Sequence, residues 1–388
     1  NGRFYCQGLG RLLALDSQNG SVIWTRDIRD VHRLNMIRDA SNFCAADEGI
    51  YMAVRGQCWL LDKDTGARTV YNVVPSNLND TASPAYEYEW GYISSEGNSV
   101  IGSATKKGSF YKDYWGQEYW FDAQSGNQTY QVCSDNIFSL NSSTGAMNWT
   151  YDVGTILNVS ITKADGKLFF LESRSSGARN TATSNLSVGT WKSSVYLVCL
   201  NINTGTKLWD KSISPSGGEP CIWLQHDNGK LFLTGSNQGN DTFYIQTYDA
   251  SNGASGWSAS HGWRSSHHGG NHQIPVISQG HLHLEPHKYD LVTGTRISNV
   301  MPTRNGCSSF RGAKNLLFFR GLGMSGQYAG NIALWHPSSN QTSAVTRVRP
   351  GCWLSYVPAH GMLLVQEQGA GCSCGSWMET SFGLAPKK

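Results

Sequence analysis

Short runs of alternating apolar and polar residues cover most of the chain, and several of them end in the same turn signal. The signal is an apolar residue, Asp or Asn, three residues and Gly, and in four copies Trp stands four residues after the Gly. These four copies begin at Leu15, Leu140, Leu200 and Tyr248. Alternation predicts β-strands, and Asp or Asn before Gly predicts a tight turn with a positive φ. Each signal, called a tag below, therefore predicts a hairpin whose second strand carries an aromatic residue between sheets.

The spacing of the tags predicts the number of sheets. Copies that lack Trp begin at Leu61, Tyr289 and Trp335, the last with Asn in place of Gly. The turn positions 20, 66, 145, 205, 253, 294 and 340 are 46, 79, 60, 48, 41 and 46 residues apart. Four of these intervals suit one four-stranded propeller blade, and the other two suit a blade with an insertion. Three apolar segments follow the last tag, so we expect an all-β fold: an eight-bladed β-propeller of four-stranded antiparallel blades, closed by joining the N- and C-terminal strands.

We expect residues 1–388 to form this single domain, with insertions at about 103–135 and 173–190. A further copy of the tag begins at Phe121, only 19 residues before the turn at Gly145 (from Gly126), so we interpret it as a hairpin inside the first insertion. The second insertion is rich in Ser, Thr, Asn and Gly, which is typical of a flexible surface loop.

The composition supports many strands and turns. Gly is abundant, with 43 residues, and charged residues make up only 15%. We find no capped helical periodicity and no apolar run long enough to span a membrane. The net charge of +3 gives no indication of a nucleic-acid partner.

Cysteines and sequons suggest a secreted protein. The ten cysteines favour disulfides in an oxidising compartment, with buried free thiols as the alternative, and Cys44 and Cys58 are expected to face each other on adjacent strands. Eight N-x-S/T sequons fit an extracellular or periplasmic glycoprotein. The chain begins with an expected strand near Arg3, so we expect that any secretion leader is absent from this sequence.

The tag resembles the repeat of the pyrroloquinoline-quinone-type β-propellers. The segments 14–24 and 199–209 match its form closely, from the apolar residue before Leu15 and Leu200 to Trp24 and Trp209. This group includes quinoprotein alcohol dehydrogenases and the non-catalytic outer-membrane assembly lipoprotein, and the C-terminal part also resembles uncharacterised bacterial secreted propellers. The resemblance implies the fold. The dehydrogenases use a vicinal Cys-Cys disulfide over the quinone, and no two cysteines are adjacent here, so we do not expect this cofactor.

Histidines concentrate in one stretch, with seven of the eleven between His261 and His287. The connection 264–273 precedes an expected innermost strand and is predicted to reach the central channel, where ligands of propellers commonly lie. Imidazole can ligate a metal or transfer a proton. The candidate catalytic residues are His267, His268, His272 and Arg304. The alternative is that these histidines are solvated or satisfy local hydrogen bonds.

A divalent metal is the second hypothesis for this stretch. His281, His283 and Glu285 alternate along a strand and share a face, and His287 follows closely. Two imidazoles and a carboxylate at this spacing are a plausible set of metal ligands. Leu282 and Leu284 are expected to point the other way, into the core.

Arginines and aromatic residues supply candidate binding surfaces. Arginines at blade entries suit carboxylates or sulfates if they converge, although ordinary surface ion pairs are the alternative. Aromatic residues in the first insertion suit sugar rings, and packing against the rim is the alternative. The candidate binding residues are Arg38, Arg264, Arg311, Arg349, Trp115, Tyr119 and Trp120.

Three functions remain open from the sequence. The first is a binding propeller for a protein, glycan or cell-envelope partner, without catalysis. The second is a carbohydrate-active enzyme such as a lyase of uronate polysaccharides, in which arginines neutralise the carboxylate and a histidine removes the α-proton. The third is a metal- or quinone-dependent oxidoreductase.

Overall fold

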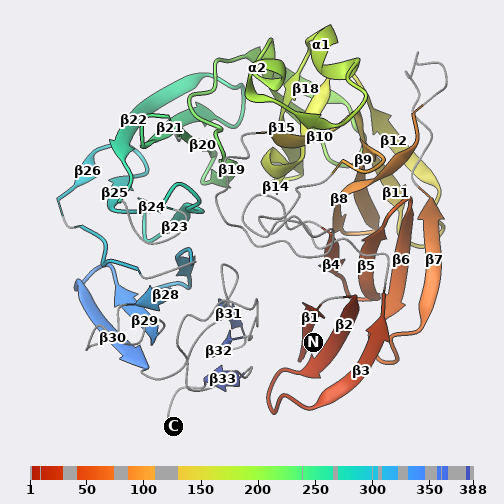
Figure 1. Ribbon diagram of the computed structural model, residues 1–388, viewed down its shortest axis with the longest axis horizontal. Coiled ribbons are helices and arrows are strands. Elements are labelled where there is room, and N and C mark those ends of the chain that lie inside the picture. The colour runs from red at the N-terminus through yellow and green to blue at the C-terminus, as the bar shows by residue number, and fades with distance from the viewer. Residues whose placement is uncertain are drawn as a thin grey trace.

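The computed structural model describes residues 2–8, 10–28, 42–73, 86–109, 130–237, 239–264, 270–298, 300–304, 308–321, 331–345, 356–359, 361–365 and 382–384. These residues form eight sheets of antiparallel strands that follow one another in chain order around a common centre (Figure 1). The prediction of an all-β fold with four-stranded antiparallel sheets is confirmed. No helix in the described part of the chain is long and apolar enough to cross a membrane.

The sheets are numbered here in chain order. Sheet 1 contains β1 (Arg3–Gly8), β2 (Arg11–Asp16) and β3 (Val22–Asp27). Sheet 2 contains β4 (Phe43–Ala45), β5 (Gly49–Val54), β6 (Gln57–Asp62) and β7 (Arg68–Val73). Sheet 3 contains β8 (Tyr88–Glu96), β9 (Ser99–Lys106), β11 (Asn136–Asn141) and β12 (Met147–Tyr151). Sheet 4 contains β10 (Gln131–Ser134), β13 (Thr155–Leu157), β14 (Thr162–Ala164), β15 (Lys167–Ser173), β16 (Asn185–Leu186), β17 (Val195–Asn201) and β18 (Lys207–Ser212).

The second half of the chain is more regular. Sheet 5 contains β19 (Ile222–Asp227), β20 (Lys230–Asn237), β21 (Thr242–Asp249) and β22 (Ser255–Gly262). Sheet 6 contains β23 (Val276–Ser278), β24 (His281–Leu284), β25 (His287–Asp290) and β26 (Arg296–Ile297). Sheet 7 contains β27 (Arg311–Gly312), β28 (Leu317–Gly321), β29 (Asn331–His336) and β30 (Gln341–Val345). Sheet 8 contains β31 (Tyr356–Ala359), β32 (Met362–Val365) and β33 (Phe382–Leu384).

The tags form the turns that the sequence predicts. In the first copy the carboxylate of Asp16 accepts backbone N–H bonds from Gln18 (2.8 Å) and Asn19 (3.1 Å). The six tag glycines have φ between 66° and 74°, and Asn340 takes the same place with φ of 57°. A positive φ costs Gly nothing and Asn little, which explains why these two residues occupy the position.

Each tag Trp joins its own sheet to the next one. The indole N–H donates to the carbonyl that follows the Asp or Asn of the next tag, and the ring covers the next tag's Gly. The four indole bonds are Trp24 to Lys63 (3.0 Å), Trp149 to Ile202 (3.0 Å), Trp209 to Ala250 (3.3 Å) and Trp257 to Leu291 (3.1 Å). A Cβ on Gly205 would lie 2.6 Å from the Trp149 ring, so only Gly permits this approach. We call this contact the Trp–Gly clamp.

Apolar clusters lie between consecutive sheets. Between sheets 1 and 2, for example, Leu12 and Ala14 pack with Ile50, Met52 and Leu61. The alternating burial along β2 follows from the pleat, which sends every second side chain to the same face. Similar clusters join each following pair of sheets as far as sheets 7 and 8.

Sheets 1 and 8 lie side by side, because β1 and β2 of sheet 1 and β32 and β33 of sheet 8 line one cavity. Among the described residues, sheets 1 and 8 are nevertheless separate three-stranded sheets. Closure of the ring by joining terminal strands therefore stays a prediction.

Two features differ from the sequence-based expectations. The insertion 173–190 has many exposed residues, as expected, but it is not an irregular loop. It contains α1 (Ser176–Arg179) and β16 and leads through α2 (Val188–Trp191) to the fully buried ring of Trp191. The few apolar residues of this insertion pack on sheet 4. The polar composition of the segment gave no sign of this packing. In the first insertion β10 pairs with β13 and β16, and residues 110–129, including the expected hairpin at Phe121, lie outside the described residues.

Cys6, Cys44, Cys58, Cys133 and Cys199 are free thiols. Cys44 lies on β4 and Cys58 on β6, and both strands flank β5, so the expectation that they face each other on adjacent strands is wrong. Cys307, Cys352, Cys372 and Cys374 lie outside the described residues.

The clamp predicts a position-specific cost for adding one methyl group. Gly205→Ala should lower stability by about 1–3 kcal/mol more than Gly166→Ala, because overpacking adds to the backbone strain. The control shares the strain, with φ of 69° against 68°, but no described atom lies within 4 Å of its Cβ. Denaturant midpoints of the two variants give the comparison. Equal losses would contradict the clamp.

Candidate functional site

Three of the described candidates, Arg264, Glu285 and Arg304, gather at the end of the sheets opposite the tags. His281 lies at the other end, where it pairs with Asp290 of a tag. Tag turns join the third strand of a sheet to its outermost strand, so the turn between the second and third strands lies at the other end. The connections from one sheet to the next also lie there. Glu285 occupies such a turn between β24 and β25, and Arg264 and Arg304 lie on the connections that enter sheets 6 and 7.

A buried brace of Arg264, Glu285 and Arg304 forms the centre of this site. The Nε of Arg304 donates to Oε2 of Glu285 at 2.6 Å, and Nη1 of Arg264 lies 3.7 Å from Oε1. The side chains of Arg304 and Glu285 are 0% and 2% exposed. Arg264 also donates to the hydroxyl of Thr303 (2.6 Å) and to the carbonyl of Met301 (3.2 Å). The brace therefore ties sheet 6 to the connections on both sides of it.

The buried ion pair between Arg304 and Glu285 contributes to the stability of the fold. Removing one partner of a buried ion pair costs about 3–5 kcal/mol because the other charge stays buried. Two arginines face one carboxylate, so the brace carries a net positive charge. Arg304 and Glu285 lie below the surface, where a substrate carboxylate does not reach Arg304, whereas the Arg264 side chain is 24% exposed.

His261 connects the brace to β25. Its Nε2 lies 3.3 Å from the Glu285 carbonyl and its Nδ1 lies 2.8 Å from the Tyr289 hydroxyl. A carbonyl only accepts, so Nε2 carries the proton, and Tyr289 donates to Nδ1. The ring of His287 packs edge-on against His261, with centroids 5.0 Å apart. Burial lowers the pKa of His261 to about 4 and also lowers that of His287.

The predicted metal ligands do not form one cluster. His283 lies on the face of β24 that packs against sheet 7, with its ring perpendicular to Trp335 at 5.7 Å, and its Nε2 donates to the Ser278 carbonyl (3.3 Å). Glu285 belongs to the brace and His287 packs on His261. Leu282 and Leu284 are buried on the other face, as expected.

The described residues hold no group of three His, Cys, Asp or Glu side chains arranged to bind a metal ion. The sequence also lacks the adjacent cysteines that quinoprotein dehydrogenases place over the quinone. The residues described here do not fit a quinone–metal centre.

His272 and Arg311 lie near the brace in the chain but serve other contacts. His272 is buried, and its Nδ1 lies 2.8 Å from Oδ1 of the neighbouring Asn271. Gln273 then donates to the Ser308 carbonyl (3.1 Å), which links the two connections. Arg311 begins β27 and donates to the Phe310 carbonyl (3.2 Å). The other candidates lie outside the described residues: His267, His268, Arg38, Arg349, Trp115, Tyr119 and Trp120.

Sequence reasoning missed two buried polar clusters. Lys106 pairs with Asp135 (3.2 Å) at the base of the first insertion, where both side chains are almost fully buried. Glu172 accepts from Tyr151 (3.0 Å) and from Arg174 (2.6 Å) in sheet 4. For the second cluster a sequence signal exists, because the alternation along neighbouring strands places Tyr151, Glu172 and Arg174 on faces that can meet. Nothing in the sequence pairs Lys106 with Asp135 across an insertion.

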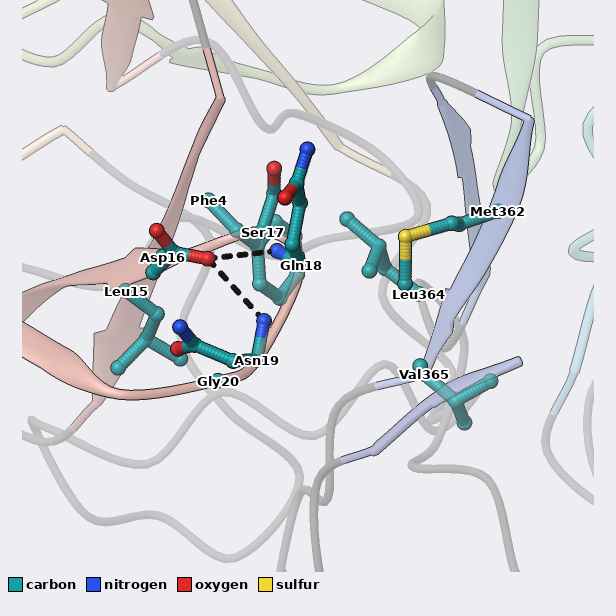
Figure 2. A pocket seen from close by; sticks show the side chains of 11 residues that line it. Phe4, Leu15, Asp16, Ser17, Gln18, Asn19, Gly20, Met362, Leu364 and Val365 are labelled. Carbon is teal, nitrogen blue, oxygen red and sulfur yellow. Dashed lines mark hydrogen bonds between the residues drawn. The ribbon is translucent and has the colours of Figure 1, made fainter. Parts of the chain in front are cut away.

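Two hollows border sheet 8. A groove of about 610 Å³ lies between sheets 7 and 8 and is mainly apolar. Its lining includes Leu316, Phe318, Leu334, Val345, Leu363 and Leu384. A second hollow of about 320 Å³ lies between sheets 8 and 1, and Figure 2 shows the first tag turn on one side of it and β32 on the other. The described lining of the first hollow is therefore mainly apolar and that of the second is mixed.

Neither a protein-family model nor a curated protein matches the sequence significantly. The solved structure of BamB from Moraxella catarrhalis is similar over 81% of this chain and 76% of its own, at 15% identity and a TM-score of 0.45. A quinohemoprotein alcohol dehydrogenase from Pseudomonas putida HK5 is similar over 94% of this chain and 63% of its own, at 14% identity and a TM-score of 0.41. A chain of the Mitotic Checkpoint Complex is similar over 92% of this chain and 90% of its own, at 10% identity and a TM-score of 0.49.

BamB and the quinohemoprotein alcohol dehydrogenase are among the solved structures to which this chain is similar. The similarity concerns the fold. What this chain does is argued from its own residues.

Acid should destabilise the protein through His261 and His283. Burial lowers the pKa of each to about 4, whereas the unfolded chain protonates near 6.5. Between these values the unfolded state binds more protons, so the free energy of unfolding falls as the pH drops from 6.5 to 4 and is fully retained above 6.5. The loss is on the order of 1–3 kcal/mol for each histidine.

Denaturant midpoints at pH 7.5 and 4.5 test this expectation. The double variant His261→Gln/His283→Gln should lose less stability over this interval than the wild type, although it starts lower. Parallel losses in the two proteins would assign the acid sensitivity to other groups.

Proposed function

We propose that this chain is a non-catalytic, eight-bladed propeller that binds a protein partner outside the cytoplasm. The eight sheets are its blades, with sheets 8 and 1 adjacent at the point where the ring closes. The sequons support the location. The observation that carries the function is the apolar groove between sheets 7 and 8.

The groove suits the side chains of a polypeptide. Its walls are Leu, Val and Phe side chains from β28, β29, β30, β32 and β33, and its volume holds several apolar side chains. Burying such walls against a partner is favourable by about 25 cal/mol for each Å² of apolar surface. A sugar, in contrast, needs polar partners for its hydroxyls, and those are scarce in this lining.

The described candidates for catalysis support a binding function as well. A lyase would need His272 and Arg304 to face a substrate, and both side chains are almost fully buried. Arg304 is engaged with Glu285 inside the brace. His272 and Arg304 hold the connections that enter sheets 6 and 7 in place, which is a supporting role in a propeller that binds a partner.

Crosslinking in cells that naturally express this chain tests the proposal. A photoreactive amino acid at Ala359, which lines the groove, should capture one polypeptide reproducibly, and the same group at the exposed Ala344 on β30 should not. With that partner purified, Ala359→Arg should raise the Kd at least tenfold, because it places a charge in an apolar groove. Ala344→Arg is the matched control and should leave the Kd unchanged.

The outcomes that contradict the proposal are equally specific. Equal crosslinking at the two positions, or equal Kd values for the two arginine variants, would remove the groove as the binding surface. Capture of a glycan alone would replace the protein partner by a carbohydrate.

A further inference from the structure

The hollow between sheets 1 and 8 repeats the geometry of the other sheet interfaces with one component missing. We call it the seam site, and it consists of the first tag turn (Leu15 to Gly20) together with Met362, Leu364, Val365 and Gly383 (Figure 2). The turn itself is formed in the same way as in the other tags, with Asp16 bonded to its own backbone. The seam site therefore has the tag turn of a sheet interface but not the side chain that covers such a turn.

The four Trp–Gly clamps show what covers such a turn. Ring atoms of Trp24, Trp149 and Trp209 lie 2.7, 2.6 and 2.7 Å from the position of a Cβ on Gly66, Gly205 and Gly253. In each case the indole N–H also reaches the carbonyl that follows the tag's Asp or Asn.

The first tag turn lacks this cover. Gly20 has the same φ of 74° but is exposed, and no described atom lies within 4 Å of its Cβ position. The carbonyl in the equivalent position is that of Ser17, directly after Asp16. One wall of the site is apolar, through Leu15, Leu364 and Val365, and this suits the body of an indole ring.

The strand that carries each clamp Trp identifies the rest of the occupant. Trp24, Trp149, Trp209 and Trp257 all lie on the outermost strand of their sheet, namely β3, β12, β18 and β22. Sheet 8 ends with β33 among the described residues. A strand added beside β33 would continue the series of sheet interfaces around the ring and would hold a Trp against Gly20.

We propose that the seam site binds an extended segment of a partner protein, which adds to the edge of β33 and places a Trp side chain over Gly20. The backbone bonds of the added strand supply affinity, and the indole pocket supplies specificity. This inference rests on the proposed function, since it names the chemistry of a protein partner. The two are tested at different faces of sheet 8, so they fail separately.

A peptide copied from this chain's own clamp strand is a direct probe. The peptide is residues 205–212 (GTKLWDKS) with capped ends and 5-fluorotryptophan at position 209. A second peptide exchanges the residues at 208 and 209. It keeps the composition but moves the indole to the opposite face of the strand, because side chains alternate. Titration followed by fluorine NMR measures both affinities.

The matched protein variants are Gly20→Asn and Gly166→Asn. Asn340 shows that a tag turn accepts Asn at this position. In the Gly20→Asn variant the new Cβ would occupy the space in which we place the indole. Gly166 has a φ of 69° and open surroundings among the described atoms, so its variant controls for the backbone. We expect saturable binding of the first peptide to the wild type, weakened at least tenfold by Gly20→Asn and by the exchanged sequence, and unchanged by Gly166→Asn and Ala359→Arg.

Three results would overturn the inference. They are no saturable binding at millimolar peptide, equal binding of the two peptides, and binding that Gly20→Asn leaves intact. If other residues of this chain occupy the seam site, the peptide shows no saturable binding, and the inference is overturned. If the peptide fails but crosslinking at Ala359 captures a partner, the seam inference falls and the proposed function stands.

Discussion

The Trp–Gly clamp is the contact on which the arrangement of the sheets depends. A four-stranded sheet needs a neighbour on each face to bury its apolar side chains, but apolar packing is not directional. The clamp adds a directional hydrogen bond and a ring that fits only over Gly. Trp149 and Gly205 show both parts, since the indole bonds the Ile202 carbonyl at 3.0 Å while its ring touches the turn. Four of the sheet interfaces are fixed in this way.

The division of the molecule into two ends follows from the clamps. The tag turns are occupied with joining sheets, so the opposite end is left to turns and connections of varied sequence. There the buried brace of Arg264, Glu285 and Arg304 supplies the rigidity that the clamps supply at the tag end. No clamp Trp among the described residues covers the first tag turn, and a hollow lies there between sheets 8 and 1. Both proposals on function concern sheet 8, where the repeating pattern is least complete.

The sequence predicted what the local chemistry of each repeat determines. The tag gave the strands, the positive φ at Gly and the aromatic packing, because each follows from residues a few positions apart. The site was harder. His281 and His283 do alternate along β24, but Glu285 lies in the turn after it, and the sequence does not reveal that sheet 7 covers His283 through Trp335. Arg304 was expected at a channel and instead neutralises Glu285, since a pairing over 19 residues is set by the fold. Trp191 lies in the core although a polar insertion carries it.

Hydrogen exchange of the indole N–H groups is the measurement that tests the central claim most directly. In nitrogen-labelled protein, the signals of Trp24, Trp149, Trp209 and Trp257 are assigned by single Trp→Phe variants. If the clamps join the sheets, all four indole protons are protected by on the order of a thousandfold relative to free tryptophan, because exchange requires neighbouring sheets to separate. Exchange of these four protons at the rate of free tryptophan would contradict the account.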